Sequence, residues 1–527
     1  MALYDKSPNV SHTGGDIMYE QDAHEMHDVY KSTATDQRDM IRMNKPQQLR
    51  RNFRFTTMFG FSVILMASWE VILATAPLGL LNGGTAGLLY TNLATWLGFI
   101  CVYASLGEQG SMAPTSGGQY HWVSEFSPRS CQKFLSYQVG WLGVLGWQVG
   151  VAFASYLAAT EIQGLIILNH PDTYVPQRWH GTLMQILLLV LCVLFNTFLA
   201  QRLHLVEGCA LALHICGFFG ILIPLWVLSP TANSHDVWTT FSNTPGWPTT
   251  GLSCMVGTVA SVAPLLGADA AAHMAEELQD ASYTLPRILT WATTINGGLM
   301  FIMCITFCYT MGDPSVLDSP TGYPFIQLFY NSTGSYAAAN AMTAIIIILS
   351  FFTAITITAG SSRQLFAFAR DGAMPFSSWI AKVRPGWDVP VNAILVIFGV
   401  AVLLSLINIG SALAFSIITS LGTGTLTLSY IVTIAIVTWR KITGQQLLPS
   451  RFNMGKTFGL LVNLIALGWM VVVLIFCFFP LFPDPLPADM NWAVVVWGGV
   501  ILFSMFYYIV WGRKKYDGPV EYVRKLD

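Results

Sequence analysis

Charged residues are scarce in this sequence of 527 residues, since Asp, Glu, Lys and Arg together make up 10% of it. An average soluble protein has about 25%. Hydrophobic residues make up 54% of the chain. So little charge cannot cover the water-facing surface of a soluble protein of this length, and a soluble globular fold is excluded. The formal net charge of −2 also argues against the basic surfaces that bind nucleic acid.

The sequence also lacks the common motifs of catalysis and ATP-driven pumping. It has no Walker A loop, no His-Glu-x-x-His motif and no Cys-x-x-Cys pair. Gly422-Thr423-Gly424 is no nucleotide loop, because it lies inside an apolar stretch with no strand before it. The nine cysteines fall mostly in apolar stretches, which is typical of core residues. We therefore expect no enzyme, no cofactor and no metal.

Long apolar stretches are what the sequence has instead. Twelve of them lie between Phe55 and Trp511, each near the ~20 residues that cross a bilayer. They are residues 57–81, 86–107, 134–167, 180–200, 205–228, 251–275, 288–311, 336–360, 391–409, 411–438, 457–480 and 491–511. This pattern predicts an all-α polytopic membrane protein with twelve transmembrane helices.

The basic residues indicate how these helices are oriented. When the spans are threaded alternately from a cytosolic N-terminus, Arg178 is the only one of the 26 Lys and Arg residues that falls outside. This agrees with the positive-inside rule, so we expect both termini in the cytosol. The sequon Asn331-Ser332-Thr333 then falls in an external loop, where Asn331 can be glycosylated.

The regions outside the spans divide the chain further. Residues 1–56 hold eight acidic and eight basic residues without a sustained apolar period, which predicts a disordered cytosolic tail. The other expected regions are a transport core at 57–438, a cytosolic loop at 439–456, two peripheral helices at 457–511 and a cytosolic tail at 512–527. The sequence assigns no oligomeric state.

The sixth stretch is interrupted where a membrane helix should be most regular. Pro264, Gly267 and Asp269 lie at this depth. Broken helices persist at mid-bilayer only where protein or a water-filled cavity surrounds the freed backbone. We therefore predict that Gly267, Ala268 and Asp269 belong to a substrate-binding site.

The first and fifth stretches carry ionisable residues. Glu70 lies about thirteen residues into its span, and an ionisable group at this depth indicates function by default. The alternative is that Glu70 is paired inside the bundle for structure alone. No span, however, contains a Lys or Arg that could pair with it. His214 is either part of a proton relay or a hydrogen-bonded core residue. Glu70, Asp269 and His214 are the candidates for proton coupling.

Three motifs resemble those of one transporter family, the amino acid–polyamine–organocation permeases. They are Glu108, Pro114, Gly117, Gly118 and Tyr120 after the second span, Gly267, Asp269, Glu277 and Pro286 around the sixth, and residues 362–375 after the eighth. The resemblance covers about residues 50–515 and is closest to the fungal amino acid/choline branch, which includes GABA and choline permeases. It implies two inverted repeats of five helices, with helices one and six unwound around the substrate, plus two peripheral helices.

The first span departs from the family pattern. Amino acid permeases often carry Gly-x-Gly there, whereas this chain reads Met66-Ala67-Ser68-Trp69-Glu70. The π-face of Trp69 and the charges of Glu70 and Asp269 suit an ammonium or quaternary amine. We therefore add Ala67, Ser68, Trp69 and Glu70 to the substrate-binding candidates, while plain packing remains the alternative for Trp69 and structural pairing for Asp269.

Charged residues at the cytosolic span ends are candidates for a gate. Surface ion pairs of about 0–1 kcal/mol each can form and break during a transport cycle. The alternative is that these charges only set the topology. The gate candidates are Arg287, Arg363 and Arg370 on one side and Glu276, Glu277 and Asp371 on the other.

Together these features predict a secondary active transporter of a small nitrogen-containing solute: an amino acid, GABA, choline or a polyamine. The absence of an ATP site indicates ion coupling, and analogy favours protons and the plasma membrane. A channel would not explain two interrupted helices, and a multi-span enzyme should show a polar catalytic cluster at one face. A transporter-like nutrient receptor and an exporter of an amine-containing metabolite remain the alternatives.

Overall fold

A computed structural model describes most of the chain. The described residues are 31–43, 47, 49–383, 389–411, 413–487, 489–516 and 518–519. They form helices and a single isolated β-bridge between Phe53 and Leu278. Twelve of the helices are long and apolar enough to cross a membrane, which confirms the predicted number of spans.

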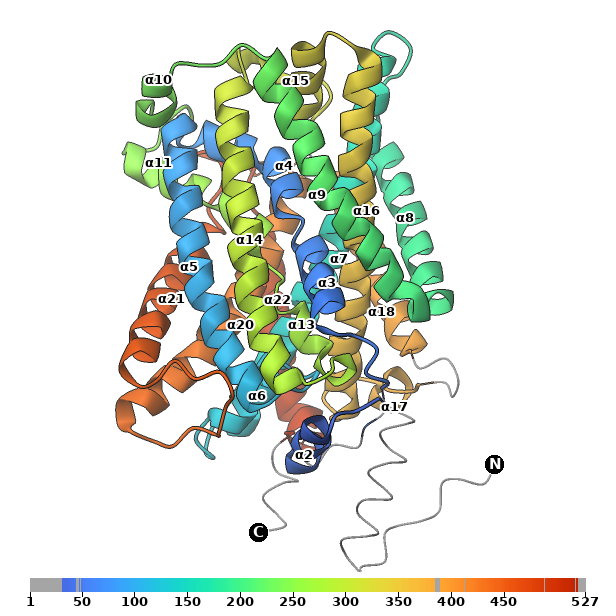
Figure 1. Cartoon of the computed structure of the whole chain (residues 1–527), viewed down its shortest axis with the longest axis vertical. Helices are drawn as coiled ribbons and strands as arrows, with labels where there is room; N and C mark the ends of the chain where they lie inside the picture. Colours follow the sequence, from blue (N-terminus) through green and yellow to red (C-terminus); the bar gives the residue numbers. More distant parts are fainter. Residues whose placement is uncertain are drawn as a thin grey trace, which may run out of the picture.

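Ten spans are continuous or nearly so, and they stand roughly parallel in one bundle (Figure 1). They are α5 (Gly84–Met112), α7 (Gln132–Asn169), α8 (Arg178–Phe198), α9 (Leu203–Leu228), α14 (Ala281–Thr310), α16 (Tyr336–Arg370), α18 (Val391–Ser405) extended by α19 (Ile407–Gly410), α20 (Ala414–Thr443), α21 (Thr457–Phe476), and α22 (Ala493–Tyr507) continued by the π-helical turn η5 (Tyr508–Gly512) and α23 (Arg513–Lys515).

The first and sixth spans are broken, as the sequence predicts. Span one consists of α3 (Phe55–Met66) and α4 (Ser68–Leu81), separated by Ala67 in the left-handed region at φ 42° and ψ 45°. Span six consists of α11 (Thr250–Gly257), α12 (Val259–Val262), the 3-10 turn η2 (Ala263–Leu265) and α13 (Ala270–His273). Gly267 has φ 99° between the last two, a conformation that glycine adopts without strain.

The two breaks lie beside each other. The Ser68 hydroxyl donates a 2.6 Å hydrogen bond to the Pro264 carbonyl, which is free because the 3-10 turn ends at Leu265. A helix interrupted in a membrane must satisfy its freed backbone groups inside the protein. The two unwound segments meet this requirement partly through each other.

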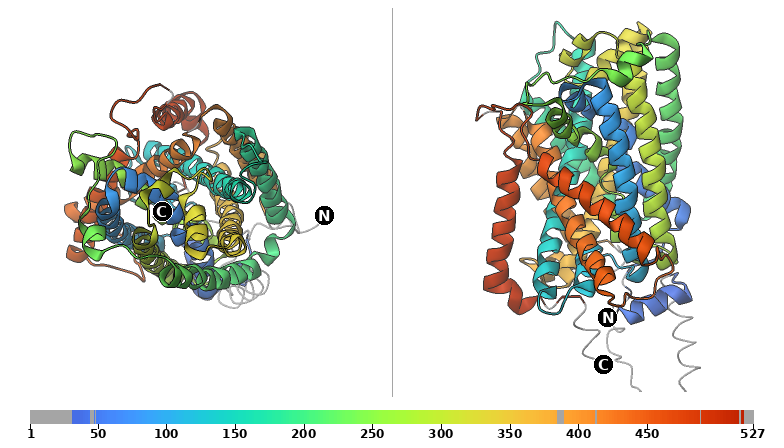
Figure 2. Two further views of the ribbon diagram at one scale, coloured as in Figure 1. Left: turned by 90° about the horizontal axis from the view of Figure 1, so that it is seen from above. Right: turned by 90° about the vertical axis from the view of Figure 1, so that its left-hand side faces the viewer.

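Short helices cover the two ends of the bundle (Figure 1). We call the end with α2 (Ala34–Arg42), α6 (Gln119–Phe126) and α17 (Ser377–Ile380) the terminal face, because α23, the last described helix, also ends there. The opposite end, with α10 (Ser234–Thr239) and α15 (Pro324–Thr333), is the distal face. Helices α21 and α22 lie on the outside of the bundle (Figure 2).

The N-terminal segment differs from its prediction. Residues 1–30 lie outside the described part of the chain. Residues 34–42, however, form α2, which begins with a capping box between Thr33 and Asp36. The buried Arg51 donates a 2.9 Å hydrogen bond to the Ala275 carbonyl. The prediction of disorder for residues 1–56 therefore does not describe residues 31–43 and 49–56, which polar contacts and the buried side chains of Met40 and Phe53 hold against the bundle.

Candidate substrate pocket

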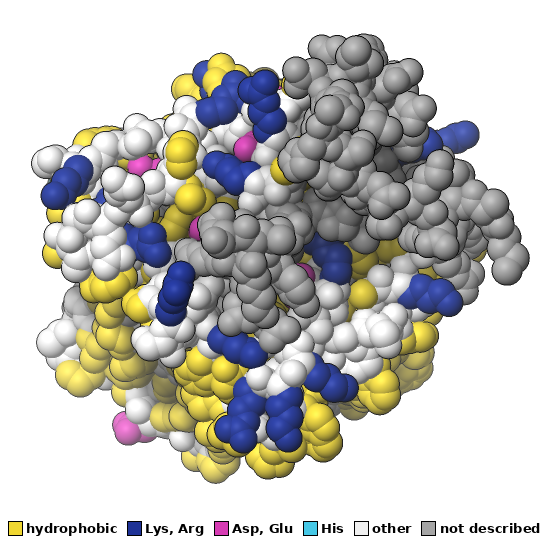
Figure 3. Space-filling view, turned by 90° about the horizontal axis from the view of Figure 1, so that it is seen from below, with side chains coloured by type: hydrophobic (Ala, Val, Ile, Leu, Met, Phe, Trp, Pro, Cys, Tyr) yellow, Lys and Arg dark blue, Asp and Glu magenta, His cyan; other side chains and the backbone are white. Residues whose placement is uncertain are grey.

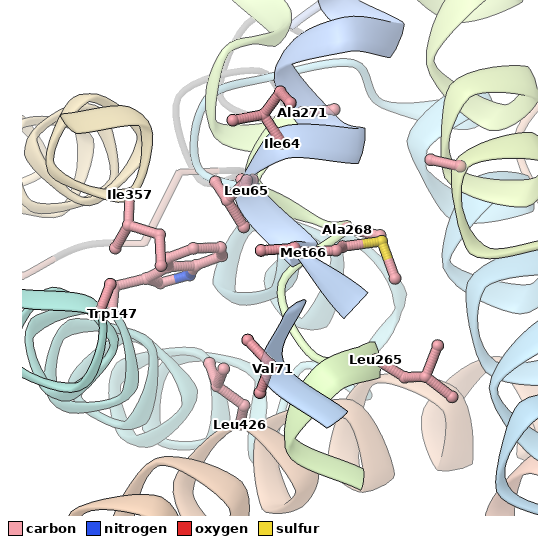
Figure 4. Packing of buried hydrophobic residues seen from close by; sticks show 14 of the residues in the cluster. Ile64, Leu65, Met66, Val71, Trp147, Leu265, Ala268, Ala271, Ile357 and Leu426 are labelled. Carbon is pink, nitrogen blue, oxygen red and sulfur yellow. The ribbon is translucent and has the colours of Figure 1, made fainter. Parts of the chain in front are cut away.

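A pocket lies where the two broken spans meet. Figure 4 shows the Trp147 side chain reaching from α7 towards the break between Leu65 and Val71, with Ile357 of α16 on its other side. The pocket is lined by Leu65, Met66 and Val71 of span one, Ala263, Leu266 and Gly267 of span six, Gly146, Trp147, Val149, Gly150 and Phe153 of α7, Thr353 and Ile357 of α16, and Ile418, Thr419, Gly422, Thr423 and Leu426 of α20.

The pocket lining contains no charged side chain. Its polar side chains are the hydroxyls of Thr353, Thr419 and Thr423 together with the Trp147 indole. The helix ends at the break in span one carry partial charges. The N-terminus of α4, at Ser68, presents partly positive N–H groups, whereas the C-terminus of α3, at Met66, presents partly negative carbonyls.

Only one predicted binding residue, Gly267, lines the pocket. Ala67 forms the left-handed link, and Ser68 is hydrogen-bonded to Pro264. The Ala268 amide donates to the Tyr103 hydroxyl over 3.3 Å. These three residues therefore shape the break instead of facing its cavity.

Trp69 and Glu70 face away from the pocket, towards α9. The Trp69 ring packs 5.8 Å from the ring of Phe218 and 5.6 Å from that of His214. The Glu70 carboxylate lies 2.6 Å from Nδ1 of His214, and both side chains are buried. Helical spacing from α3 would place these two side chains elsewhere, but the left-handed turn at Ala67 changes the direction in which they point. Trp69 thus has the packing role, and Glu70 has a titratable partner that the sequence argument did not assign to it.

Asp269 lies next to the pocket in a separate polar cluster. Its carboxylate accepts hydrogen bonds from the Tyr430 hydroxyl at 2.5 Å and from the Gln119 amide at 2.6 Å. The Tyr103 hydroxyl accepts from the Gly267 amide at 3.0 Å and donates to the Leu265 carbonyl at 3.0 Å. This cluster fixes the unwound part of span six from three sides.

Sequence reasoning missed Tyr103, Tyr430 and Gln119. A Tyr in a membrane helix is not distinctive, because it is often an interface anchor. Gln119 follows the motif residues Gly117 and Gly118, which was the one signal that placed it near a functional region. The sequence left open whether Asp269 binds substrate or is paired for structure, and in the structure it is paired with Tyr430 and Gln119.

Two ion pairs join the predicted gate residues at the terminal face. Arg370 lies 3.0 Å from Glu276, and Arg363 lies 2.8 Å from Glu277. Glu276 is fully buried, and the Arg363 side chain is 3% exposed. The expectation of surface pairs is therefore wrong, because α16 packs these arginines under the linker that follows span six.

The other two gate candidates are arranged differently. The Arg287 guanidinium lies over the Tyr283 ring, 3.6 Å from its centroid, and the residue is exposed. Asp371 accepts a 2.9 Å hydrogen bond from the Tyr120 hydroxyl. Arg287 thus stands apart from the buried pairs, and Asp371 connects α16 to α6.

A third buried pair was not predicted. The Lys441 ammonium lies 2.6 Å from Glu108, whose second oxygen accepts a 3.0 Å hydrogen bond from the Met454 amide. This pair joins α5, α20 and the loop after α20. Glu108 was recognised only as a motif residue, and its partner lies 333 positions away in the sequence.

The ion pairs and the pocket occupy different levels of the bundle. On α16, which runs from Tyr336 at the distal face to Arg370 at the terminal face, the pocket residues Thr353 and Ile357 precede both gate arginines. On α20 the pocket residues likewise precede Lys441. Buried ionic contacts therefore lie between the pocket and the terminal face.

Comparisons with known proteins place this architecture. The chain is 27% identical to the choline transporter of Saccharomyces cerevisiae, over 98% of this chain and 90% of that protein. It is 26% identical to amino-acid permease 2 of Neurospora crassa, over 89% and 86%. A crystal structure of the Eremococcus coleocola manganese transporter is similar with a TM-score of 0.51 at 14% identity, covering 89% of this chain and 95% of that one. That likeness concerns the fold alone.

The fold is the predicted one, with helices one to five and six to ten as the two repeats of a LeuT-like core and two further helices outside it. The model of the amino acid permease family matches residues 53–501, which is most of the chain. This protein is an integral multi-pass membrane protein, and it belongs to the amino acid permease family.

Proposed function

We propose that this protein is a secondary active transporter that moves a small nitrogen-containing organic solute by alternating access. The observation that carries the proposal is the pocket between the two broken spans, with buried ion pairs between it and the terminal face. A site closed on one side by contacts that can be exchanged is what alternating access requires. The arrangement corresponds to a state closed towards the terminal face.

The pocket supports an amine as the charged part of the solute. The face of the Trp147 indole attracts an ammonium or quaternary ammonium group, and the carbonyls at the end of α3 favour a positive charge. If the solute also carries a carboxylate, the N-terminus of α4 is the place that favours it. The related proteins are named for choline and amino acids, and both classes of solute suit this lining.

Proton coupling is proposed through Glu70 and His214. They lie 2.6 Å apart and are buried beside the break in span one. The neighbouring residues Met66 and Val71 face the pocket from the same break. Protonation of the pair can therefore change how α3 and α4 pack without a direct contact to the solute.

The terminal face is proposed to be cytosolic, and the plasma membrane is the proposed location. Lys and Arg side chains are spread over the terminal face (Figure 3), as the positive-inside rule requires of a cytosolic surface. Asn331 is exposed in α15 at the distal face. Expression in a glycosylating host should therefore yield a glycan that the Asn331→Gln change removes, whereas a band that this change and deglycosylation leave unshifted would count against an external α15.

Uptake in whole cells tests the proposed function. Cells that express the protein should accumulate one of labelled choline, GABA, polyamines or amino acids, and a protonophore should reduce this accumulation. No uptake of any candidate, together with a nutrient signal that depends on the protein, would favour the receptor. Faster loss of a preloaded amine would favour the exporter.

A further inference from the structure

Glu161 is a buried carboxyl group that the pocket, the gate and the Glu70–His214 pair do not use. It lies on α7, which ends at Asn169 near the distal face. The side chain is fully buried. The Ser350 hydroxyl of α16 is its polar neighbour, yet neither carboxyl oxygen accepts a geometrically sound hydrogen bond within the described residues.

Most other buried acids of the bundle have stronger partners, whereas Glu207 accepts one hydrogen bond, from the Thr356 hydroxyl. Glu276, Glu277 and Glu108 each face an Arg or Lys, and Asp269 accepts two short hydrogen bonds. An ionised carboxylate without such partners is strongly disfavoured in a membrane interior, so the group holds a proton instead. Glu161 is therefore suited to carry a proton and poorly suited to hold helices together.

Glu161 lies within electrostatic range of the coupling pair, because the charge of Glu70 of span one acts on it. The second oxygen of Glu70 and Nε2 of His214 are, like Glu161, buried without a hydrogen-bond partner in the described residues. These free positions are where a proton can arrive and leave.

The distal side of Glu161 is closed by tyrosine side chains. Tyr323, just before α15, and Tyr156 of α7 are the other titratable groups that face this region. The Tyr323 hydroxyl lies 2.6 Å from the hydroxyl of Thr160, the residue next to Glu161. Helix α15 packs over α4 and α7 at this point, so movement of α15 would open Glu161 to the distal solution.

We propose that Glu161 carries protons from the distal solution to the Glu70–His214 pair. In this step the Glu161 O–H bond breaks, and a proton passes through bridging water to the Glu70 carboxylate. Glu161 is left as a carboxylate and is protonated again from the distal side, so no electrons are exchanged. The proposal rests on proton-coupled transport as the function of the protein.

The Glu161→Gln variant tests this role, because glutamine keeps the shape of the side chain but cannot release a proton. In wild-type cells, uptake should rise when the outside is acidified and fall with a protonophore. The variant should lose both responses, while exchange of labelled for unlabelled solute across equilibrated membranes continues. Glu161→Asp, which retains the carboxyl group, should restore part of the acid response.

Ser155→Ala is the matched control, since it removes a buried hydroxyl group, which does not ionise, from the same helix. It should keep the full acid response. A Glu161→Gln variant that exchanges solute and still responds to acid as the wild type does would overturn the role of Glu161 alone. Wild-type uptake that ignores both acid and protonophore would overturn the proton coupling on which the role rests. A variant that reaches the membrane but loses exchange as well would mean that Glu161 is structural.

Discussion

The Glu70 carboxylate and Nδ1 of His214 lie 2.6 Å apart in the interior of the bundle, and neither side chain lines the pocket. The pair lies beside the break in span one but outside the pocket. A single acid could have both bound the solute and carried the proton, whereas this arrangement allows different residues to do so. In the proposed function, the pocket recognises the solute and the pair couples transport to protons.

Replacement of Glu70 distinguishes these roles. We expect Glu70→Gln to abolish accumulation driven by a proton gradient while surface expression and solute exchange persist, because glutamine cannot be charged but keeps the shape. Accumulation and exchange of labelled solute in vesicles measure the two properties. If the variant loses both exchange and accumulation, Glu70 binds the solute. If accumulation is unchanged, Glu70 has no role in coupling.

The pair of Arg370 with Glu276 gives a second prediction. Removing one partner of a buried ion pair costs about 3–5 kcal/mol, so Arg370→Ala should shift the protein towards a state open at the terminal face. The rate at which a membrane-permeant thiol reagent labels a cysteine introduced beside the pocket should then rise. Arg287→Ala is the matched control, since Arg287 is exposed over Tyr283. Equal labelling in the two variants, with normal transport, would return Arg370 to a topological role.

The N-terminal segment is expected to stabilise the same closed state. Asp36 accepts hydrogen bonds from the backbone amides of Asp280 and Ala281 at 3.0 and 3.1 Å, so its carboxylate caps α14 from another helix. It also lies 3.3 Å from Arg51, whose pKa is lowered by burial and held up by this carboxylate. Both contacts hold the linker that carries Glu276 and Glu277.

Loss of such a cap costs about 1 kcal/mol. Asp36→Ala should therefore lower the melting temperature of the purified protein and raise labelling of the cysteine beside the pocket. Arg38→Ala, an exposed change in the same helix, should do neither. If Asp36→Ala melts and labels like the wild type, the N-terminal segment does not secure the gate.

The sequence predicted the number of spans and the break in span six, because apolar length and interrupting residues such as Pro264 and Gly267 are local signals, whereas the break in span one followed from the family resemblance. It could not predict where Trp69 and Glu70 point. The left-handed Ala67 breaks the helical period, so positions after it cannot be assigned to a face by counting. The pair of Glu108 with Lys441 joins distant residues, and no local pattern marks such a contact.

The pocket itself can be tested through Gly150, where α7 leaves space for a solute. A Cβ atom added there would meet Ile357 at 3.6 Å, an ordinary contact, so Gly150→Ala should fold normally. The larger Gly150→Val change should fill part of the pocket and raise the KM for the transported solute, with a greater effect on larger solutes than on smaller ones. Gly399→Val is the control, because a Cβ atom there meets nothing within 4 Å.

Uptake kinetics with solutes of graded size measure the effect. If Gly150→Val at normal surface levels transports all of them as the wild type does, the solute binds elsewhere, and the pocket at the two breaks is not the transport site.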